Sequence, residues 1–290
     1  MANPQEFRPE YSSTYVVLDR ANQQELVRMA IQDQLLTTSM GGVLPEQPAP
    51  TIFRRVLDVG CGTGGWLIGL AREFPTTALL IGVDISSKML DYAREQALAQ
   101  GVNERVEFHV MDVLRMLEFP ADYFGLVNQR MGSSYLRNWE WRKLLQAYTH
   151  ILQPGGVLRI TESDMVTVSS STAYIRFNQL VFQALNQAGH FLAPAPDGVT
   201  SQLAPLFAQN GFQNIQTRAH VVEYRAGTPQ GERYFNDAQY ASRTLLPFLQ
   251  KWLHVPEDYE TTCQQMLADM QQPDFTATWH LLTVWGNRPT

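Results

Sequence analysis

Short apolar runs alternate with amphipathic stretches along the middle of the chain. The apolar runs are Arg54–Val59, Ala78–Val83, Val106–Met111, Tyr123–Gln129 and Val157–Thr161. Their near-continuous apolar character predicts strands that are covered on both faces. The intervening stretches carry apolar residues at helical spacing and predict helices over Gly65–Glu73, Ser87–Gln100 and Trp139–Leu152. Strand–helix alternation of this kind predicts an α/β fold with a parallel sheet and right-handed crossovers.

The two flanks of this region differ from it in pattern. Before it, a helix is expected over Asn22–Thr38, followed by the Gly41-Gly42 stop and a proline-containing connector over Pro45–Pro50. After it, the expected elements are a helix over Thr172–Gln187, a helix ending at Asn210, a strand over Ile215–Tyr224, helices over Glu232–Trp252 and Asp258–Gln271, and a last strand over Ala277–Trp285. About fifty residues therefore separate the last two strands.

The strand over Arg54–Val59 runs directly into a cluster of glycines. Gly60, Gly62 and Gly65 satisfy the dinucleotide-binding pattern, and Asp84 lies near the distance expected for a ribose-binding acid. A glycine turn before a helix lets backbone N–H groups approach a ligand. Asp58, however, would repel a pyrophosphate at this turn and would attract an ammonium group. A nicotinamide-dependent oxidoreductase therefore stays as the alternative to an enzyme that uses a cationic adenosyl cofactor.

Three acidic residues fall at or near the carboxyl ends of expected parallel strands. They are Asp58, Asp84 and Asp112. In open parallel sheets the ligand lies beyond the carboxyl ends of the strands. We therefore expect one crevice to receive all three side chains.

Several segments together resemble the class I S-adenosylmethionine-dependent methyltransferases. Asp58-Val59-Gly60-Cys61-Gly62-Thr63-Gly64 is similar to the first motif of that family. The segments similar to the later motifs are Leu79–Ser86, Val106–Val113 and Leu152–Leu158. They occur in the family's order, over roughly residues 54 to 162. The resemblance implies a Rossmann-like, doubly wound, mostly parallel seven-stranded sheet and S-adenosylmethionine as the cofactor.

The resemblance also assigns roles to individual residues. Asp84 would accept the ribose hydroxyls, Asp112 the adenine amino group, and the Val113 N–H would meet a ring nitrogen. The full cofactor-binding set expected is Asp58, Gly60, Cys61, Gly62, Asp84, Ile85, Met89, Asp112, Val113, Asn128 and Gln129. A helix N-cap is the structural alternative for Asp84, although Ser86 serves equally well for that.

The same resemblance predicts how the chain is divided. Residues 1–50 are expected to form an N-terminal helical lid, or else a helix that packs on the edge of the domain. Residues 51–163 form the cofactor-binding core, and residues 164–290 complete the sheet and carry helical substrate-cap elements. Among these, a helical insertion before the last strand is expected beside the active site, as the carrier of substrate specificity. All three parts are expected to make one elaborated domain.

The sequence offers fewer candidates for catalytic residues than for cofactor-binding residues. Glu162 and Asp164 follow the fifth strand, His190 lies in a loop rich in helix breakers, and Arg130 ends the fourth strand. Of these, Glu162, His190 and Arg130 are the catalytic candidates, with Arg130 equally suited to a structural ion pair. A lone histidine in a loop is usually solvated. Tyr11 and Tyr15 could close on the cofactor from the leader.

Composition limits the substrate. The chain has 290 residues, of which 44% are hydrophobic, and 22 basic against 28 acidic residues give a formal charge of −6. This balance argues against nucleic acid as a partner, because phosphate neutralisation needs a basic surface. The absence of the Asn-Pro-Pro-Tyr signature after residue 127 agrees with this. Aromatic residues are frequent outside the motifs and favour an apolar cavity for a bulky small molecule.

Other features set the remaining expectations. Cys61 and Cys263 lie far apart, and no metal-binding spacing is present, so no metal is expected. Neither a signal peptide nor an apolar run of roughly 20 residues is visible, which predicts a cytoplasmic protein that does not contact membranes. The hypothesis is methyl transfer by direct displacement to oxygen, nitrogen or carbon of a small hydrophobic metabolite, in specialised metabolism. A non-catalytic cofactor-binding protein is a further alternative, and a homo-oligomer is left open.

Overall fold

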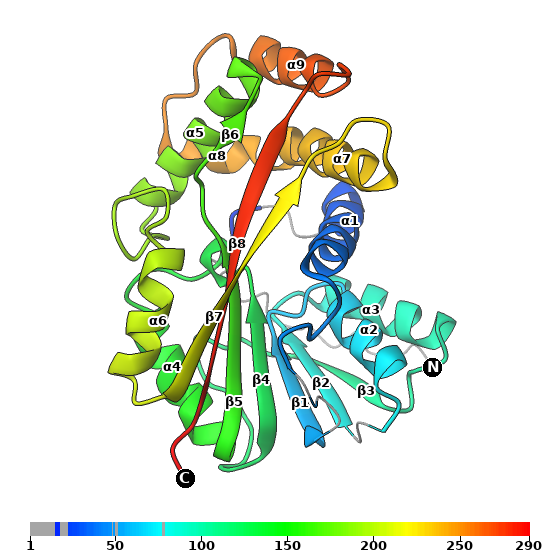
Figure 1. The fold of residues 1–290 in the computed structure, drawn as a ribbon, viewed down its shortest axis with the longest axis vertical. Helices are drawn as coiled ribbons and strands as arrows, with labels where there is room; N and C mark the ends of the chain where they lie inside the picture. The colour runs from blue at the N-terminus through cyan, green and yellow to red at the C-terminus, as the bar shows by residue number, and fades with distance from the viewer. Residues whose placement is uncertain (1–14, 18–22, 48, 50–51, 77–78) are drawn as a thin grey trace, which may run out of the picture.

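The computed structural model describes residues 15–17, 23–47, 49, 52–76 and 79–290. Tyr11, Asn22, Pro50 and Ala78, which were part of the expectations above, lie outside these ranges. The described part is an α/β structure built around one mixed sheet (Figure 1).

The sheet follows the expected strands closely. Its parallel strands are β1 (Arg55–Val59), β2 (Leu79–Asp84), β3 (Val106–Val110), β4 (Phe124–Arg130) and β5 (Leu152–Ser163). They lie in the order β3-β2-β1-β4-β5. The antiparallel strand β8 (Ala277–Asn287) pairs with β5, and β7 (Gln213–Glu223) pairs with β8 on its other edge. The expected seven strands are therefore present, and an eighth, the short β6 (Val168–Ser169), was not expected from the sequence.

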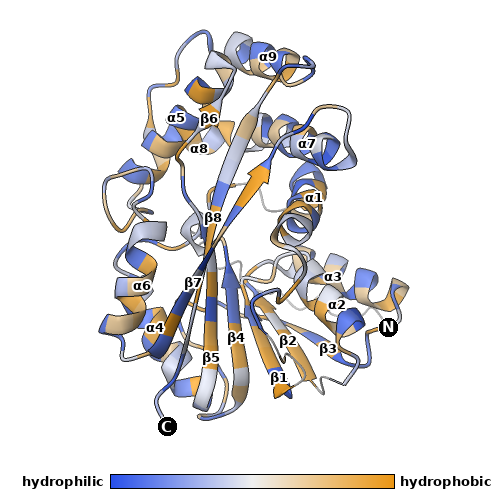
Figure 2. Ribbon diagram, in the orientation of Figure 1, coloured by the Kyte–Doolittle hydropathy of each residue, from blue (hydrophilic) through white to orange (hydrophobic). Residues whose placement is uncertain are grey.

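Helices cover both faces of the parallel part of the sheet. One face carries α2 (Gly65–Glu73) and α3 (Ser87–Ala99), and the other carries α4 (Trp141–Ile151) and α6 (Thr200–Gln209). Successive residues of a strand point to opposite faces, so Val56 packs with the α2 side and Leu57 with the α4 side. Figure 2 shows the apolar character of β1 and β2 along their length, as burial on both sides requires.

Besides the two hydrophobic cores on the faces of the sheet, a third lies beyond the carboxyl ends of the parallel strands. It is formed by α1 (Gln23–Met40), α5 (Thr172–Gln187), α7 (Pro229–Thr244), α8 (Leu246–Trp252) and α9 (Tyr259–Asp269). We call these five helices the cap. The long strands β7 and β8 extend upward from the sheet into the cap (Figure 1).

The insertion between β7 and β8 is helical, as expected, and the helical pattern near Glu232–Trp252 is divided between two helices. The structure has α7 and α8 there, separated at Leu245. Pro247 occupies the first turn of α8, where its missing N–H has no intrahelical partner to lose. Within the part of the chain that the structure describes, no helix has the length and apolarity needed to cross a bilayer.

Candidate functional site

A cavity of about 280 Å³ lies between the carboxyl ends of the parallel strands and the cap. One wall comes from the turns after β1, β2 and β3, and the opposite wall comes from α1, α5, α7 and α8. The cavity therefore occupies the place where a doubly wound sheet binds its ligand.

The glycine turn after β1 forms part of the cavity wall. Gly60 has a φ of +66°, and a Cβ built there would lie 2.8 Å from the Tyr135 hydroxyl oxygen. Gly64 has a φ of +73° and ends the turn as the N-cap of α2. Its added Cβ would lie 2.7 Å from a ring carbon of Phe108. Both positions need glycine for backbone conformation and for space.

Asp84 ends β2 and lines the cavity. One of its carboxylate oxygens accepts the Gly62 N–H at 3.0 Å, and the other accepts the Ser86 N–H at 2.9 Å. The carboxylate thus joins the turn after β1 to the start of α3. Ser86 is the N-cap of α3, with its hydroxyl accepting the Met89 N–H at 3.4 Å. The capping role that was open for Asp84 is therefore taken by Ser86.

The expected adenine-side residues lie on the same wall. Ile85, Met89, Asp112 and Val113 all line the cavity with Asp84. The Asp112 carboxylate accepts the Leu114 N–H at 3.0 Å, which fixes the loop after β3. The structure therefore brings together the acids at the ends of two neighbouring strands and the apolar side chains between them.

Other members of the expected cofactor-binding set lie behind this wall. Asp58 is 3% exposed, and the Asn128 side-chain amide donates to its carboxylate at 2.7 Å. The Gln129 side-chain oxygen accepts the Tyr148 hydroxyl at 2.5 Å, also out of contact with the cavity. Burial raises the pKa of Asp58 to about 7, opposed by the Arg130 charge and the Asn128 hydrogen bond. These side chains support the wall from beneath.

The remaining two members belong to the turn itself. Cys61 packs its sulfur under Gly82, where an added Cβ would lie 2.8 Å from it. Burial raises the pKa of the Cys61 thiol well above its ordinary value, so the thiol is neutral. Gly62 contributes the N–H that Asp84 accepts. Neither residue lines the cavity.

The three catalytic candidates are placed differently from one another. Arg130 lines the cavity, forms an ion pair with Asp33 of α1, and donates to the Thr37 hydroxyl at 3.2 Å. Asp33 in turn lies against Gly65, at the N-terminus of α2, where any added Cβ would collide with its carboxylate. Arg130 thus ties α1 to the sheet beside the cavity.

Glu162 is fully buried at the end of β5 and does not line the cavity. Its carboxylate accepts the Gly132 N–H at 2.5 Å and the Ser133 N–H at 3.1 Å. Burial raises its pKa to about 7, and these hydrogen bonds oppose the rise. Glu162 therefore holds the turn Gly132–Ser134, and Ser133 and Ser134 line the cavity. Asp164, just beyond it, lies 3.7 Å from the His280 ring nitrogen.

His190 was expected to be solvated if it is not catalytic, and that expectation is wrong. Its side chain is fully buried and stacks edge-on against Phe248, with ring centroids 6.0 Å apart. The loop folds back onto the end of α5, where the His190 N–H donates to the Leu185 carbonyl at 3.0 Å. Burial, followed by the Arg137 charge, lowers the pKa of His190 to about 4. The imidazole is neutral and does not line the cavity.

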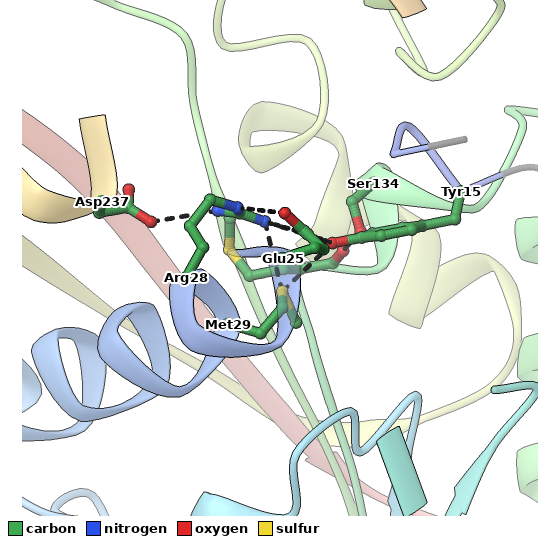
Figure 3. A network of polar contacts seen from close by, with 7 residues as sticks. Tyr15, Glu25, Arg28, Met29, Ser134 and Asp237 are labelled. Carbon is green, nitrogen blue, oxygen red and sulfur yellow. Dashed lines mark hydrogen bonds and ion pairs between the residues drawn. The ribbon is translucent and has the colours of Figure 1, made fainter. Parts of the chain in front are cut away.

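A buried polar network was missed by sequence reasoning, apart from Tyr15. It joins Tyr15, Glu25 and Arg28 to Asp237 of α7, and Figure 3 shows Arg28 between the two carboxylates. Glu25 and Arg28 are three residues apart on one face of α1, which was the available signal. Asp237 lies 209 residues from Arg28, and nothing in the local sequence indicated that the two would pair. Among the described residues, no group of three or more His, Cys, Asp or Glu could hold a metal ion.

Comparison with known proteins gives consistent matches. Residues 56–156 match the sequence profile of the methyltransferase domain. A demethylmenaquinone methyltransferase of Lactiplantibacillus plantarum is 30% identical over 171 residues, which cover 55% of this chain and 70% of that protein. An N-methyltransferase of Claviceps purpurea, tcpN, is 22% identical over 285 residues, covering 93% of this chain and 96% of that protein.

A solved structure supports the fold. The structure of Haemonchus contortus phosphoethanolamine N-methyltransferase 2 with S-adenosyl-L-methionine has a TM-score of 0.55 and 19% identity. The match covers 97% of this chain and 61% of that one. The similarity therefore extends through the cap.

Proposed function

The chain belongs to the class I S-adenosylmethionine-dependent methyltransferases, and from this premise we propose that it methylates a small, largely apolar molecule. The observation that carries the proposal is the cavity itself. It extends from Asp84 and Asp112 on the sheet side to Phe177 and Phe248 on the cap side. One space is therefore shared by a wall suited to an adenosyl group and a wall suited to an apolar acceptor.

The residues present fit the cofactor. Gly60 presents only backbone to the cavity, and Asp84 and Asp112 offer carboxylates on the cavity wall. We assign Asp84 to the ribose hydroxyls, Asp112 and the Val113 N–H to the adenine edge, and Ile85 and Met89 to the adenine faces. The bound cofactor supplies an electrophilic methyl group on its sulfonium.

The remaining expected residues act at the other end of the cofactor. Gly60, Cys61 and Gly62 shape the turn that receives the amino acid portion. Asp58 lies beneath this turn, and its ionised form, which the Arg130 charge and the Asn128 hydrogen bond favour against burial, attracts an ammonium group nearby. Asn128 and Gln129 act through Asp58 and Tyr148, whose positions they fix.

The chain's catalytic contribution is mainly to orient the reactants and to exclude water. Arg130 holds α1 over the cavity through Asp33 and carries the only cationic group that β4 places at the cavity wall, within the described residues. Glu162 acts as a positioning residue for the turn Gly132–Ser134. His190 supports the cap from behind Phe248.

The relatives support a small-molecule acceptor. Their names give demethylmenaquinone and phosphoethanolamine as the substrates of those proteins. The apolar cap wall supports a hydrophobic acceptor in this chain, and a role in specialised metabolism follows as part of the proposal.

Calorimetric titration tests the cofactor assignment. The ligands are S-adenosylmethionine, S-adenosylhomocysteine and NADPH. The proteins are the unchanged chain, Asp84→Asn, and Asp91→Asn as a control at an exposed carboxylate of α3. We expect both adenosyl ligands to bind the unchanged chain and the control, and to bind Asp84→Asn at least about tenfold more weakly.

The outcome of this titration is decisive in both directions. Equal binding by Asp84→Asn overturns the ribose assignment, and binding of NADPH alone overturns the cofactor. Transfer of labelled methyl from S-adenosylmethionine to apolar small molecules then separates an enzyme from a binding protein without turnover.

A further inference from the structure

The network around Arg28 forms part of the cavity wall where α1 faces α7 (Figure 3). The Glu25 carboxylate accepts two hydrogen bonds from the Arg28 guanidinium, at 2.8 and 2.7 Å. Arg28 also donates to the Asp237 carboxylate at 3.1 Å. Its guanidinium is therefore shared between two acids on different helices.

The charge of this group does not balance. One guanidinium faces two carboxylates, whose side chains are 0% and 16% exposed. The Tyr15 hydroxyl donates to Glu25 at 2.7 Å and is neutral, because burial first and Glu25 second raise its pKa. Arg130, the other described cation on the cavity wall, is engaged by Asp33. Burial raises the pKa of Asp237, and the Arg28 charge opposes the rise. With both carboxylates ionised, a net negative charge remains at this part of the cavity.

Aromatic rings line the same cavity as the carboxylate that α7 contributes to this group. Tyr234 precedes Asp237 by one helical turn and lines the same cavity. The Tyr174 and Tyr234 hydroxyls are hydrogen-bonded at 2.5 Å, and the Trp279 ring lies edge-on to Tyr234 at 6.4 Å. All three rings line the cavity. A carboxylate beside aromatic rings is a typical environment for an organic ammonium group.

Most of the rest of the cap wall is apolar, and its other polar side chains, Gln32 and Asn178, are uncharged. Phe177, Val181, Leu185 and Phe248 line it. Such a wall suits a hydrocarbon or aromatic body and gives no counter-charge to a carboxylate or phosphate. An anionic substrate would also be repelled by the unbalanced acid.

From this arrangement we infer that the substrate is a small lipophilic amine, bound as its ammonium ion with Asp237 as charge partner and Tyr234 beside it. The inference rests on the proposed function and names the substrate class of that same cavity. Arg28 holds Asp237 in place and is itself neutralised by Glu25. The ammonium group anchors the molecule, while the apolar body fills the space between α5 and α8.

Binding to the protein saturated with S-adenosylhomocysteine tests the inference. The probes are 4-phenylbutylamine, 4-phenylbutanol and 4-phenylbutyrate, which share one body and differ in the headgroup. Calorimetry should show the amine binding at least about tenfold more tightly than the alcohol, and the carboxylate binding most weakly. The proposed function fails separately, if S-adenosylhomocysteine itself does not bind.

Variants identify the residue responsible. Asp237→Asn should reduce the affinity for the amine to about that for the alcohol and leave the affinity for the alcohol unchanged. Glu232→Gln removes the same charge from an exposed position of α7 and should change nothing. Trp279→Leu leaves the ion pairs intact and should weaken the binding of the amine about threefold. If Asp237→Asn no longer binds S-adenosylhomocysteine, the affinity of Trp279→Leu for the amine is the test of the inference.

Three results would overturn the inference. The first is equal affinity of the unchanged chain for the amine and for either other probe. The second is binding of S-adenosylhomocysteine without binding of any probe. The third is a preference for the amine that survives both Asp237→Asn and Trp279→Leu.

Discussion

Asn128 connects a buried acid to a buried base. It is the register partner of Asp58 on the neighbouring parallel strand, and its amide donates to that carboxylate at 2.7 Å. Its side-chain oxygen accepts from the Arg159 guanidinium, also at 2.7 Å, and Arg159 is paired with Glu46 at 2.5 Å. Asn128 uses its donor toward the anion and its acceptor toward the cation, which fixes the orientation of its amide.

Replacing Asn128 by leucine should therefore lower the free energy of unfolding by about 2 to 4 kcal/mol, because two buried charged groups each lose a hydrogen bond. Urea denaturation measures the change. Asn103→Leu, at an exposed loop position, should stay within about 0.5 kcal/mol of the unchanged protein. A loss below about 1 kcal/mol for Asn128→Leu would contradict the proposed role of the amide.

The stability of the protein should fall as pH rises from about 5 to 7. In the folded state burial raises the pKa of Glu162 from 4.5 to about 7, so the folded protein keeps a proton that the unfolded chain releases. The stabilisation is complete below the unfolded pKa and is lost as pH rises through the folded one. The shift corresponds to roughly 3 kcal/mol. Asp58 acts in the same direction, whereas His190, whose pKa burial lowers to about 4, acts in the opposite direction below its unfolded pKa.

Urea titrations at several pH values measure this slope. Glu162→Gln carries no titrating group and should make the fall in stability smaller, with Asp58 and the opposing His190 accounting for the remainder. An unchanged slope in Glu162→Gln would show that Glu162 is ionised in the folded protein.

Gly60 and Gly101 provide a matched pair for the turn at the cavity. Both have a φ of +66°, but an added Cβ meets Tyr135 at position 60 and nothing within 4 Å at position 101. Gly101→Ala should cost about 1 kcal/mol of stability through backbone strain alone. Gly60→Ala should cost more and should weaken S-adenosylhomocysteine binding at least about tenfold, because Tyr135 must move into the cavity. Equal effects of the two substitutions would exclude the steric explanation.

Asp33 and Arg130 should be strongly coupled. Their side chains are 18% and 13% exposed, and they join α1 to β4. A double-mutant cycle with Asp33→Asn and Arg130→Gln should give a coupling energy of about 1 to 2 kcal/mol in urea denaturation. The exposed pair Arg176–Asp258, with side chains 47% and 52% exposed, should give less than about 0.5 kcal/mol. Similar values for both pairs would mean that α1 is not held by this contact.

The shared cavity of Asp84 and Asp112 was predictable because the information for it is local. Asp84 and Asp112 each follow an apolar strand, and parallel strands place their carboxyl ends at one edge. Asp58 shows the limit of this reasoning. It was expected at the same crevice, but it lies within β1 rather than after it, and its side chain is buried beneath the turn.

The cap was predictable as helices over a substrate pocket, but its polar network was not. Its helices are packed by contacts between distant segments, and the pairing of Arg28 with Asp237 leaves no mark in either local sequence. His190 illustrates the same point, since a loop rich in helix breakers gave no indication that its imidazole would be buried against Phe248. The break after α7 was readable from Pro247, whose ring cannot continue a helix.

The segment 224–276 leaves and rejoins the sheet at adjacent points. Glu223 and Thr278 are register partners of β7 and β8, and the Tyr224 N–H donates to the Ala277 carbonyl at 2.9 Å. Insertions, deletions or a whole exchange of this segment can therefore be accommodated without changing the pairing of any strand. The part of the cavity wall that α7 and α8 supply can thus differ between chains while the sheet stays as it is, provided that the new segment fits α1 and α5.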